Sequence, residues 1–245
     1  MFRSSKWSLA ISLALLWILT VLLLLSYDKL QLVDHNTGKI FCIVQTTNTG
    51  KHIKRALAVK KTWGRRCDGF LFASDERNHS LPAMKFSKSG RQYITFKMRN
   101  AYRYVYEKYG KHFDWFVKAD DDTYIVMENL KHFLKTSNPN DPHYFGKPLI
   151  VHGDIYPSGS AYVMSKKALS KLVTTAYKDT NFSNCPTPRP NAHEDVDTAK
   201  CLASVGIYLE GTNDMEGKSK FLPLAPWAML EGNLKRSHWI WKYDK

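Results

Sequence analysis

Residues 114–124 read DWFVKADDDTY, and this stretch decides how the chain folds. Its first five residues are rich in aromatic and β-branched side chains and predict a buried strand. Three adjacent carboxylates follow, at residues 120–122. Because they repel one another at a strand end, they need a positive partner, and a divalent cation with oxygen ligands suits them. The alternative is a turn in which Asp122 or Thr123 caps the next helix.

On both sides of this stretch, strand-like apolar runs alternate with segments whose apolar side chains recur at helical spacing. Strands are expected at residues 39–45, 69–73, 114–118, 160–164 and 207–209, and helices at residues 52–63, 96–109, 128–135, 166–177 and 193–203. Ser165 is the expected N-cap of the fourth helix. The alternation predicts an α/β domain with a mainly parallel central sheet and helices on both faces. Ligands of such sheets bind at the carboxyl ends of the strands, where residues 120–122 lie.

A second acidic stretch, HEDVD at residues 193–197, begins the last expected helix. Its carboxylates favour the positive end of the helix dipole, or one of them acts as a general base on a hydroxyl group. Spacing alone leaves both readings open. The stretch YPSGSAY at residues 156–162 places small residues, Gly159 among them, before a strand. Small residues let a bulky ligand approach the backbone closely, although an ordinary turn has the same composition.

The N-terminal stretch WSLAISLALLWILTVLLLL, residues 7–25, contains no charged residue. A helix of this length spans roughly 28 Å, about the hydrocarbon thickness of a bilayer. Arg3 and Lys6 precede it, so residues 1–6 are expected in the cytosol and the rest of the chain in the lumen, a type II orientation. Residues 26–38 are expected as a stem and residues 39–245 as one lumenal domain. A cleaved signal peptide is the less favoured alternative, because its apolar core is shorter.

The composition limits which kinds of molecule the chain is expected to bind. With 36 Lys and Arg against 22 Asp and Glu, the formal net charge is +14, which attracts anions. The basic residues are spread over the expected helices and form no zinc-finger or RRM pattern, so nucleic acid is not expected as a partner. Four cysteines in a lumenal chain predict disulfides, and the short-range pairs Cys42–Cys67 and Cys185–Cys201 are favoured. The absence of a CxxC motif argues against zinc.

Taken together, the motifs resemble one family. The segments KTW at residues 61–63, DWFVKADDDTYIVMENL at 114–130, YFGKP at 144–148, SGSAYVMSKKAL at 158–169 and EDVDTAKCL at 194–202 are similar, in this order, to those of the core-1 β1,3-galactosyltransferases. The resemblance covers residues 38–243. It implies a GT-A-like fold after one transmembrane helix, a Golgi location, and inverting transfer of galactose from UDP-galactose to the 3-hydroxyl of Ser/Thr-linked N-acetylgalactosamine on glycoproteins.

The resemblance also implies site residues. Asp120 and Asp121 match contacts to the nucleotide sugar, and Asp122, with Asp120, matches the ligands of a manganese ion. Lys97 matches a lysine that faces the phosphates. Asp195, with Glu194 beside it, matches the base that activates the acceptor hydroxyl. Partners would be the UDP-sugar donor, the glycoprotein acceptor and the membrane, and the pattern also leaves room for a homodimer.

The sequence departs from the family pattern at three places. The family's Gly-Gly-Ala-Gly-Tyr run is SGSAY here, at residues 158–162, and Ala199 replaces a family glycine. Family members also continue past an aromatic segment to a histidine that completes the metal site, which this sequence lacks at the matching position. An alternative is therefore kept open: a weakly active or inactive family member that acts as a lumenal partner or chaperone of active transferases.

Overall fold

The computed structural model describes residues 15–22, 38–151, 153–179, 184–230, 234–235 and 238–243. The chain divides into two units, Met1–Thr37 and Gly38–Lys245. Of the first unit, residues 15–22 are described and are helical. The expected cytosolic tail, the rest of the expected span 7–25 and nearly all of the expected stem lie outside the described residues. Within the described residues, no helix combines the length and apolarity needed to cross a bilayer.

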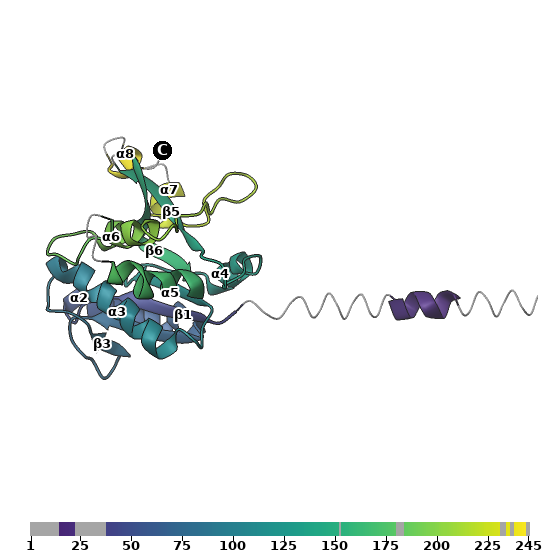
Figure 1. The fold of residues 1–245 in the computed structure, drawn as a ribbon, viewed down its shortest axis with the longest axis horizontal. Helices are drawn as coiled ribbons and strands as arrows, with labels where there is room; N and C mark the ends of the chain where they lie inside the picture. Colours follow the sequence, from purple (N-terminus) through teal and green to yellow (C-terminus); the bar gives the residue numbers. More distant parts are fainter. Residues whose placement is uncertain are drawn as a thin grey trace, which may run out of the picture. The chain divides into compact units, whose positions relative to one another are not determined.

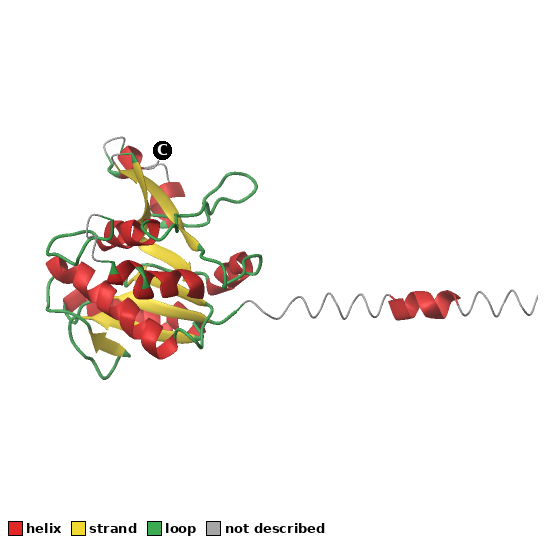
Figure 2. Ribbon diagram, in the orientation of Figure 1, coloured by secondary structure: helices red, strands yellow, loops and turns green. Residues whose placement is uncertain are grey.

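A six-stranded sheet runs through the described part of the second unit, in the order β3-β2-β1-β4-β6-β5 (Figures 1 and 2). The strands are β1 (Ile40–Gln45), β2 (Gly69–Ser74), β3 (Ala83–Lys85), β4 (Trp115–Asp120), β5 (Tyr144–Val151) and β6 (Asp154–Ser165). The first four strands in this order are parallel, while β6 pairs antiparallel with β4 and with β5. The prediction of a mostly parallel sheet is therefore confirmed, with an antiparallel hairpin added at one edge.

The sequence analysis missed two strands and placed one wrongly. The short edge strand β3 and the whole of β5 were not predicted, and the expected strand at residues 207–209 does not form. There the chain makes one bridge between Phe145 and Glu210, and Tyr208 is 70% exposed. The apolar run at 207–209 therefore passes the free edge of β5 without adding a strand to it.

Helices cover both faces of the sheet, as expected. The longer elements are α2 (Gly50–Lys61), α3 (Ile94–Tyr109), α4 (Met127–Leu134), α5 (Lys166–Thr174) and α6 (Glu194–Ala203), and the shorter ones are α7 (Pro226–Leu230), α8 (Ile240–Tyr243), η1 (Trp63–Arg66), η2 (Arg91–Tyr93) and η3 (Ala176–Lys178). Apolar residues of α3, α5 and α6 share one buried cluster with the sheet, and those of α2 and α4 share the other. Ser165 caps α5 as predicted, because its Oγ accepts a hydrogen bond from the Ala168 amide at 3.1 Å.

Strand β4 shows how the two layers are separated. Trp115, Val117 and Ala119 belong to the cluster beneath α2 and α4, and Phe116 belongs to the opposite cluster. Side chains alternate along a strand, so Lys118 and Asp120 point to the same side as Phe116, toward the layer that contains α6. The sheet thus directs one buried lysine and one carboxylate toward the start of α6.

Two disulfides connect these elements. Cys42 on β1 is joined to Cys67 after η1, and Cys185 is joined to Cys201 on α6. These are the two short-range pairs expected from the sequence. The sequence separations are 25 and 16 residues, and closing loops of this size stabilises a fold by roughly 3 kcal/mol each.

Candidate active site

Three segments meet at one edge of the sheet. Asp120 is the last residue of β4, and the antiparallel pairing places Ala119 opposite Ala161 of β6. The small residues 158–160 therefore lie beside the end of β4. The Thr123 hydroxyl donates a hydrogen bond to the Ser160 carbonyl oxygen at 2.9 Å, which holds the loop after β4 against β6. The start of α6 adds Glu194 and Asp195 to the same place.

A cavity of about 320 Å³ opens between these segments. Its lining comes from η2, the start of α3, β4, β6, the start of α6 and the three residues before α6. The lining residues are Arg91, Gln92, Ile94, Lys118, Asp120, Gly159, Asn191, Ala192, His193, Glu194 and Asp195. Four of the expected site residues are thereby brought together, namely Asp120, Gly159, Glu194 and Asp195. A cavity of this volume is within the range that holds small-molecule ligands.

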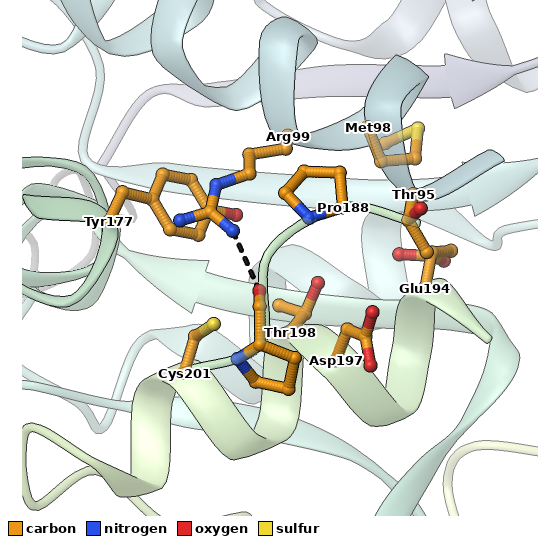
Figure 3. Close-up of a pocket in the computed structure, with 10 residues that line it drawn as sticks. Thr95, Met98, Arg99, Tyr177, Pro188, Glu194, Asp197, Thr198 and Cys201 are labelled. Carbon is orange, nitrogen blue, oxygen red and sulfur yellow. Dashed lines mark hydrogen bonds between the residues drawn. The ribbon is translucent and has the colours of Figure 1, made fainter. Parts of the chain in front are cut away.

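A much smaller pocket lies between α6 and α3, with about 20 Å³ available, and Glu194 lines this pocket as well (Figure 3). There the Arg99 guanidinium stacks over the Tyr177 ring and donates a hydrogen bond to the Pro186 carbonyl oxygen at 2.8 Å. This volume is close to that of a single water molecule, so the pocket has no room for a sugar.

Lys118 lies at the floor of the larger cavity and has a side chain only 1% exposed. Its Nζ is 2.8 Å from Asp120 Oδ1 and 2.7 Å from Glu194 Oε1, and it also donates a hydrogen bond to the Gly159 carbonyl oxygen. Burial by itself lowers the pKa of Lys118, but the two carboxylates outweigh burial and raise the pKa above its ordinary value. The lysine therefore stays charged.

Glu194 is the buried member of the acidic pair on α6. Its Oε2 accepts a hydrogen bond from the Tyr162 hydroxyl at 2.9 Å, and that hydroxyl in turn contacts the Tyr102 hydroxyl. Burial raises the pKa of Glu194 to about 7, against the opposing effect of Lys118. Burial likewise raises the pKa of both tyrosines well above the ordinary value, so they remain protonated and able to donate.

Asp195, the next residue, is half-buried at the cavity wall. Its Oδ1 accepts a hydrogen bond from the Val196 amide at 2.8 Å. Its Oδ2 lies against Gly159, so closely that a Cβ at residue 159 would stand 2.7 Å from that oxygen. Glycine at 159 therefore lets the carboxylate of Asp195 pack directly against β6.

The other two carboxylates of the triplet do not line this cavity. Asp121 is buried, and its Oδ2 accepts hydrogen bonds from Thr46 Oγ1 at 2.7 Å and pairs with His52 Nδ1 at 2.8 Å. Asp122 is 54% exposed and pairs with Arg55 of α2 at 3.1 Å. The triplet thus faces three surroundings: the cavity, the interior and the solvent.

Lys97 on α3 is also outside the cavity lining. It is 5% exposed and donates a hydrogen bond to the Thr46 carbonyl oxygen at 2.6 Å. Burial lowers its pKa, although the carboxylates of Asp75, Asp121 and Asp120 act in the opposite direction. Lys97 therefore contacts the backbone just after β1, and among the described residues it has no carboxylate contact as close as those of Lys118.

Within the described residues, no group of three or more His, Cys, Asp and Glu side chains is arranged to hold a metal ion. The oxygen ligands that manganese and magnesium prefer are nevertheless present in Asp120 and Asp122. Asp122 is near enough that its charge contributes to the raised pKa of Asp120, which burial raises first and Lys118 opposes. Two carboxylates fit a cation that also takes waters and substrate phosphates, and do not form a complete protein cage.

The sequence-based reasoning missed Lys118 and Tyr162. Both lie on strands among apolar residues, and a single polar side chain in such a run does not by itself indicate a functional site. One signal was available: residues 118 and 120 are two apart on a strand and must share a side. Placing Tyr162 beside them required the register that pairs it with Lys118 across β4 and β6.

Comparison with known proteins now places the chain. A family model described as Fringe-like matches residues 35–215, which is most of the sequence. The chain belongs to the Fringe-like family. All residues that line the cavity fall within the matched range.

Three relatives illustrate the similarity. Glycoprotein-N-acetylgalactosamine 3-beta-galactosyltransferase 1 of Xenopus laevis is 32% identical over 212 residues, which cover 84% of this chain and 56% of that protein. Chondroitin sulfate synthase 3 of Homo sapiens is 25% identical over 173 residues, which cover 62% of this chain and 19% of that protein. Beta-1,3-glucosyltransferase of Mus musculus is 26% identical over 182 residues, which cover 69% of this chain and 34% of that protein. The resemblance to the core-1 β1,3-galactosyltransferases is confirmed, while the chain spans about half the length of the first relative.

Proposed function

We propose that this Fringe-like chain transfers galactose from UDP-galactose to the 3-hydroxyl of Ser/Thr-linked N-acetylgalactosamine, with inversion at the sugar carbon. The single observation that carries the proposal is the cavity that Asp120 and Asp195 share. Its lining includes one carboxylate at the end of a sheet strand, another at the start of α6, and a charged lysine. The similarity to the Xenopus laevis galactosyltransferase supports the choice of sugar and acceptor.

Asp195 is the proposed general base. A sugar hydroxyl has too high a pKa to attack unaided, and a carboxylate within hydrogen-bond reach accepts its proton as the new bond forms. The acceptor oxygen bonds to the anomeric carbon of galactose, the bond from that carbon to the UDP oxygen breaks, and UDP leaves with the electron pair. The α-linked donor thereby gives a β-linked product.

Other side chains of the site bind and orient. Asp120 at the cavity floor is the proposed contact to the nucleotide sugar, with Asp121 and Lys97 in support behind it. Arg91 brings positive charge to the cavity wall, where it favours an anionic leaving group. Asp122 and Asp120 would hold a manganese ion, which when bound supplies the positive charge that stabilises departing diphosphate.

We also propose a Golgi location with a single-pass type II orientation, in which residues 7–25 span the membrane. The two disulfides support an oxidising compartment. Protease protection in sealed membranes tests the orientation: an epitope after residue 243 is expected to resist protease until detergent is added. Degradation of that epitope in intact membranes contradicts the lumenal placement.

A donor screen tests the proposed reaction. The purified full chain is incubated with an N-acetylgalactosamine-bearing peptide and UDP-galactose, UDP-N-acetylgalactosamine or UDP-glucuronic acid, each with manganese or with EDTA. We expect transfer from UDP-galactose in manganese only, and a β1,3 linkage by NMR. Transfer of another sugar corrects the donor. No transfer from any donor by correctly folded chain overturns the proposal and favours the role of a partner of active transferases.

A further inference from the structure

Lys118 is a buried cation that contacts three different elements of the site. Its Nζ donates hydrogen bonds to Asp120 at the end of β4 and to the Gly159 carbonyl oxygen on β6. It also forms an ion pair with Glu194 at the start of α6, at 2.7 Å. The side chain is 1% exposed, and water has little access to replace any of the three.

Fold stability alone does not account for this arrangement. Buried ion pairs are often no more stabilising than apolar side chains of the same size, because burial of each charge opposes folding. The neighbouring positions on the same side of β4 and β6, Phe116 and Met164, are apolar and fully buried. A long apolar residue at 118 would continue that layer, and yet the chain has a lysine where the cavity begins.

Two of the residues that Lys118 contacts are the immediate supports of Asp195. Glu194 precedes Asp195 in the chain, and Gly159 contacts Asp195 Oδ2. The third group that Lys118 contacts, Asp120, is the last residue of β4 and also lines the cavity. One ammonium group thus fixes both the carboxylate expected to contact the donor and the two residues that set the position of the expected base.

We infer that Lys118 is a positioning residue for the transfer reaction, because it holds the wall that carries Asp195 at a fixed distance from Asp120. The inference rests on the proposed function for its kinetic consequence, whereas its structural consequence can be measured without any turnover. Displacement of a reacting group by about 1 Å lowers a rate by about 100-fold. Reactive groups must be held within about 0.5 Å of their working positions.

The test replaces Lys118 in the full chain and uses Lys166 as a matched control. Lys166 pairs with Asp114 at 3.1 Å at the other end of β4, away from the cavity. Crystal structures of Lys118→Met and Lys166→Met are compared with the unmodified chain. We expect the Asp195 carboxylate to move by more than about 0.5 Å relative to Asp120 in Lys118→Met only.

Kinetics give the second measurement. Per folded molecule, Lys118→Met is expected to lower kcat about 100-fold while the KM for the acceptor changes less than threefold, and Lys166→Met to leave both within threefold. If Lys118→Met does not fold, Lys118→Arg replaces it, because a planar guanidinium keeps the charge but directs its N–H groups differently.

The outcomes separate the two proposals. An Asp195 that keeps its place in the Lys118 variant overturns the positioning role, whether or not the unmodified chain transfers sugar. If Asp195 is displaced in the Lys118 variant but the unmodified chain transfers no sugar, Lys118 still positions Asp195, and the proposed function is overturned. Equal losses of kcat in the Lys118 and Lys166 variants also count against the inference.

Discussion

In the triplet at the end of β4 the most buried carboxylate is that of Asp121, whereas in the pair at the start of α6 it is that of Glu194. Asp121 is held by the buried Thr46 hydroxyl. It also pairs with two partly exposed side chains of α2, those of His52 and Arg55. Glu194 is held by a buried lysine and a buried tyrosine. Each buried carboxylate has a more exposed neighbour, Asp120 in the first segment and Asp195 in the second.

The difference shows which segment is more firmly fixed. Asp121 ties the triplet to α2, where solvent reaches two of its partners, His52 and Arg55. Glu194 is surrounded by groups that cannot leave without exposing charge in the interior, so the backbone that carries Asp195 is held more rigidly. In both segments the buried carboxylate anchors, and the neighbour at the cavity is available for chemistry.

The largest effect is expected from Asp195→Asn. An amide cannot accept the acceptor proton, and general-base catalysis contributes between 10² and 10⁴, so kcat should fall about 1,000-fold. Initial rates with UDP-galactose measure this. The matched control is Asp197→Asn on the same helix, whose carboxylate is buried and pairs with Arg189 at 3.2 Å outside the cavity. If kcat falls less than tenfold in Asp195→Asn, or equally in the control, Asp195 is not the general base, and the proposed difference in role between Glu194 and Asp195 is wrong.

The next effect concerns Glu194 and pH. The folded chain keeps the Glu194 proton up to about pH 7, whereas the ordinary pKa is 4.5, so the folded state binds more protons between these values. The free energy of unfolding should therefore decrease as pH rises from 4.5 to 7, by roughly 3 kcal/mol from this group. The decrease ends near pH 7, where folded and unfolded chains are both ionised.

Urea unfolding of the chain and of Glu194→Gln at pH 5, 6, 7 and 8 isolates this contribution, because other titrating groups are common to both. The gap between the two should change steeply up to pH 7 and level off above it. If the difference in unfolding free energy between the two chains stays constant with pH, Glu194 does not have a raised pKa in the folded chain.

Much of this architecture could be predicted from the sequence because it follows from local pattern. The alternation of strand and helix periods predicted β1, β2, β4 and the five long helices within a few residues. It predicted only the second half of β6, which begins at Asp154 and not at residue 160. β5 escaped prediction because its sequence, YFGKPLIV, contains Gly146 and Pro148, which are uncommon in strands. The edge strand β3, at three residues, is too short for a period.

The site could be predicted in part. Carboxylates at the end of a buried strand and at a helix start are visible in the sequence, and so are small residues between them. What brings them together is strand register and the position of α6, which no single segment encodes. The roles of Asp121 and Lys97 as buried contacts of the Thr46 side chain and backbone depend on the same packing.

A smaller effect is expected from Gly159→Ala. The added Cβ would stand 2.7 Å from Asp195 Oδ2, so the carboxylate or β6 must shift by several tenths of an ångström. We expect kcat to fall about tenfold, because small misplacement of a base lowers its efficiency. Gly211→Ala is the control, since a Cβ there meets no atom within 4 Å. If both variants keep full activity, close packing of Asp195 on β6 is not needed for turnover.

The smallest effect separates the two contacts that hold residues 158–160 against β4. Lys118 donates to the Gly159 carbonyl oxygen, and Thr123 donates to the Ser160 carbonyl oxygen at 2.9 Å. Thr123→Val removes only the second and keeps the side-chain shape, so the free energy of unfolding should fall by about 1 kcal/mol. Because the lysine still holds the same segment, kcat should fall no more than threefold.

Urea midpoints and initial rates of Thr123→Val measure both quantities, with Thr136→Val as control, whose exposed hydroxyl makes a longer hydrogen bond of 3.4 Å. The control should change neither quantity. Thr123 is also held through its backbone, since its carbonyl oxygen accepts a hydrogen bond from Trp63 Nε1 at 3.0 Å, so the loop keeps its path without the hydroxyl. A rate loss in Thr123→Val as large as that in Gly159→Ala would mean that the contacts of the loop after β4 hold the site as firmly as the buried contacts of Glu194. The proposed difference between the two acidic segments would then be wrong.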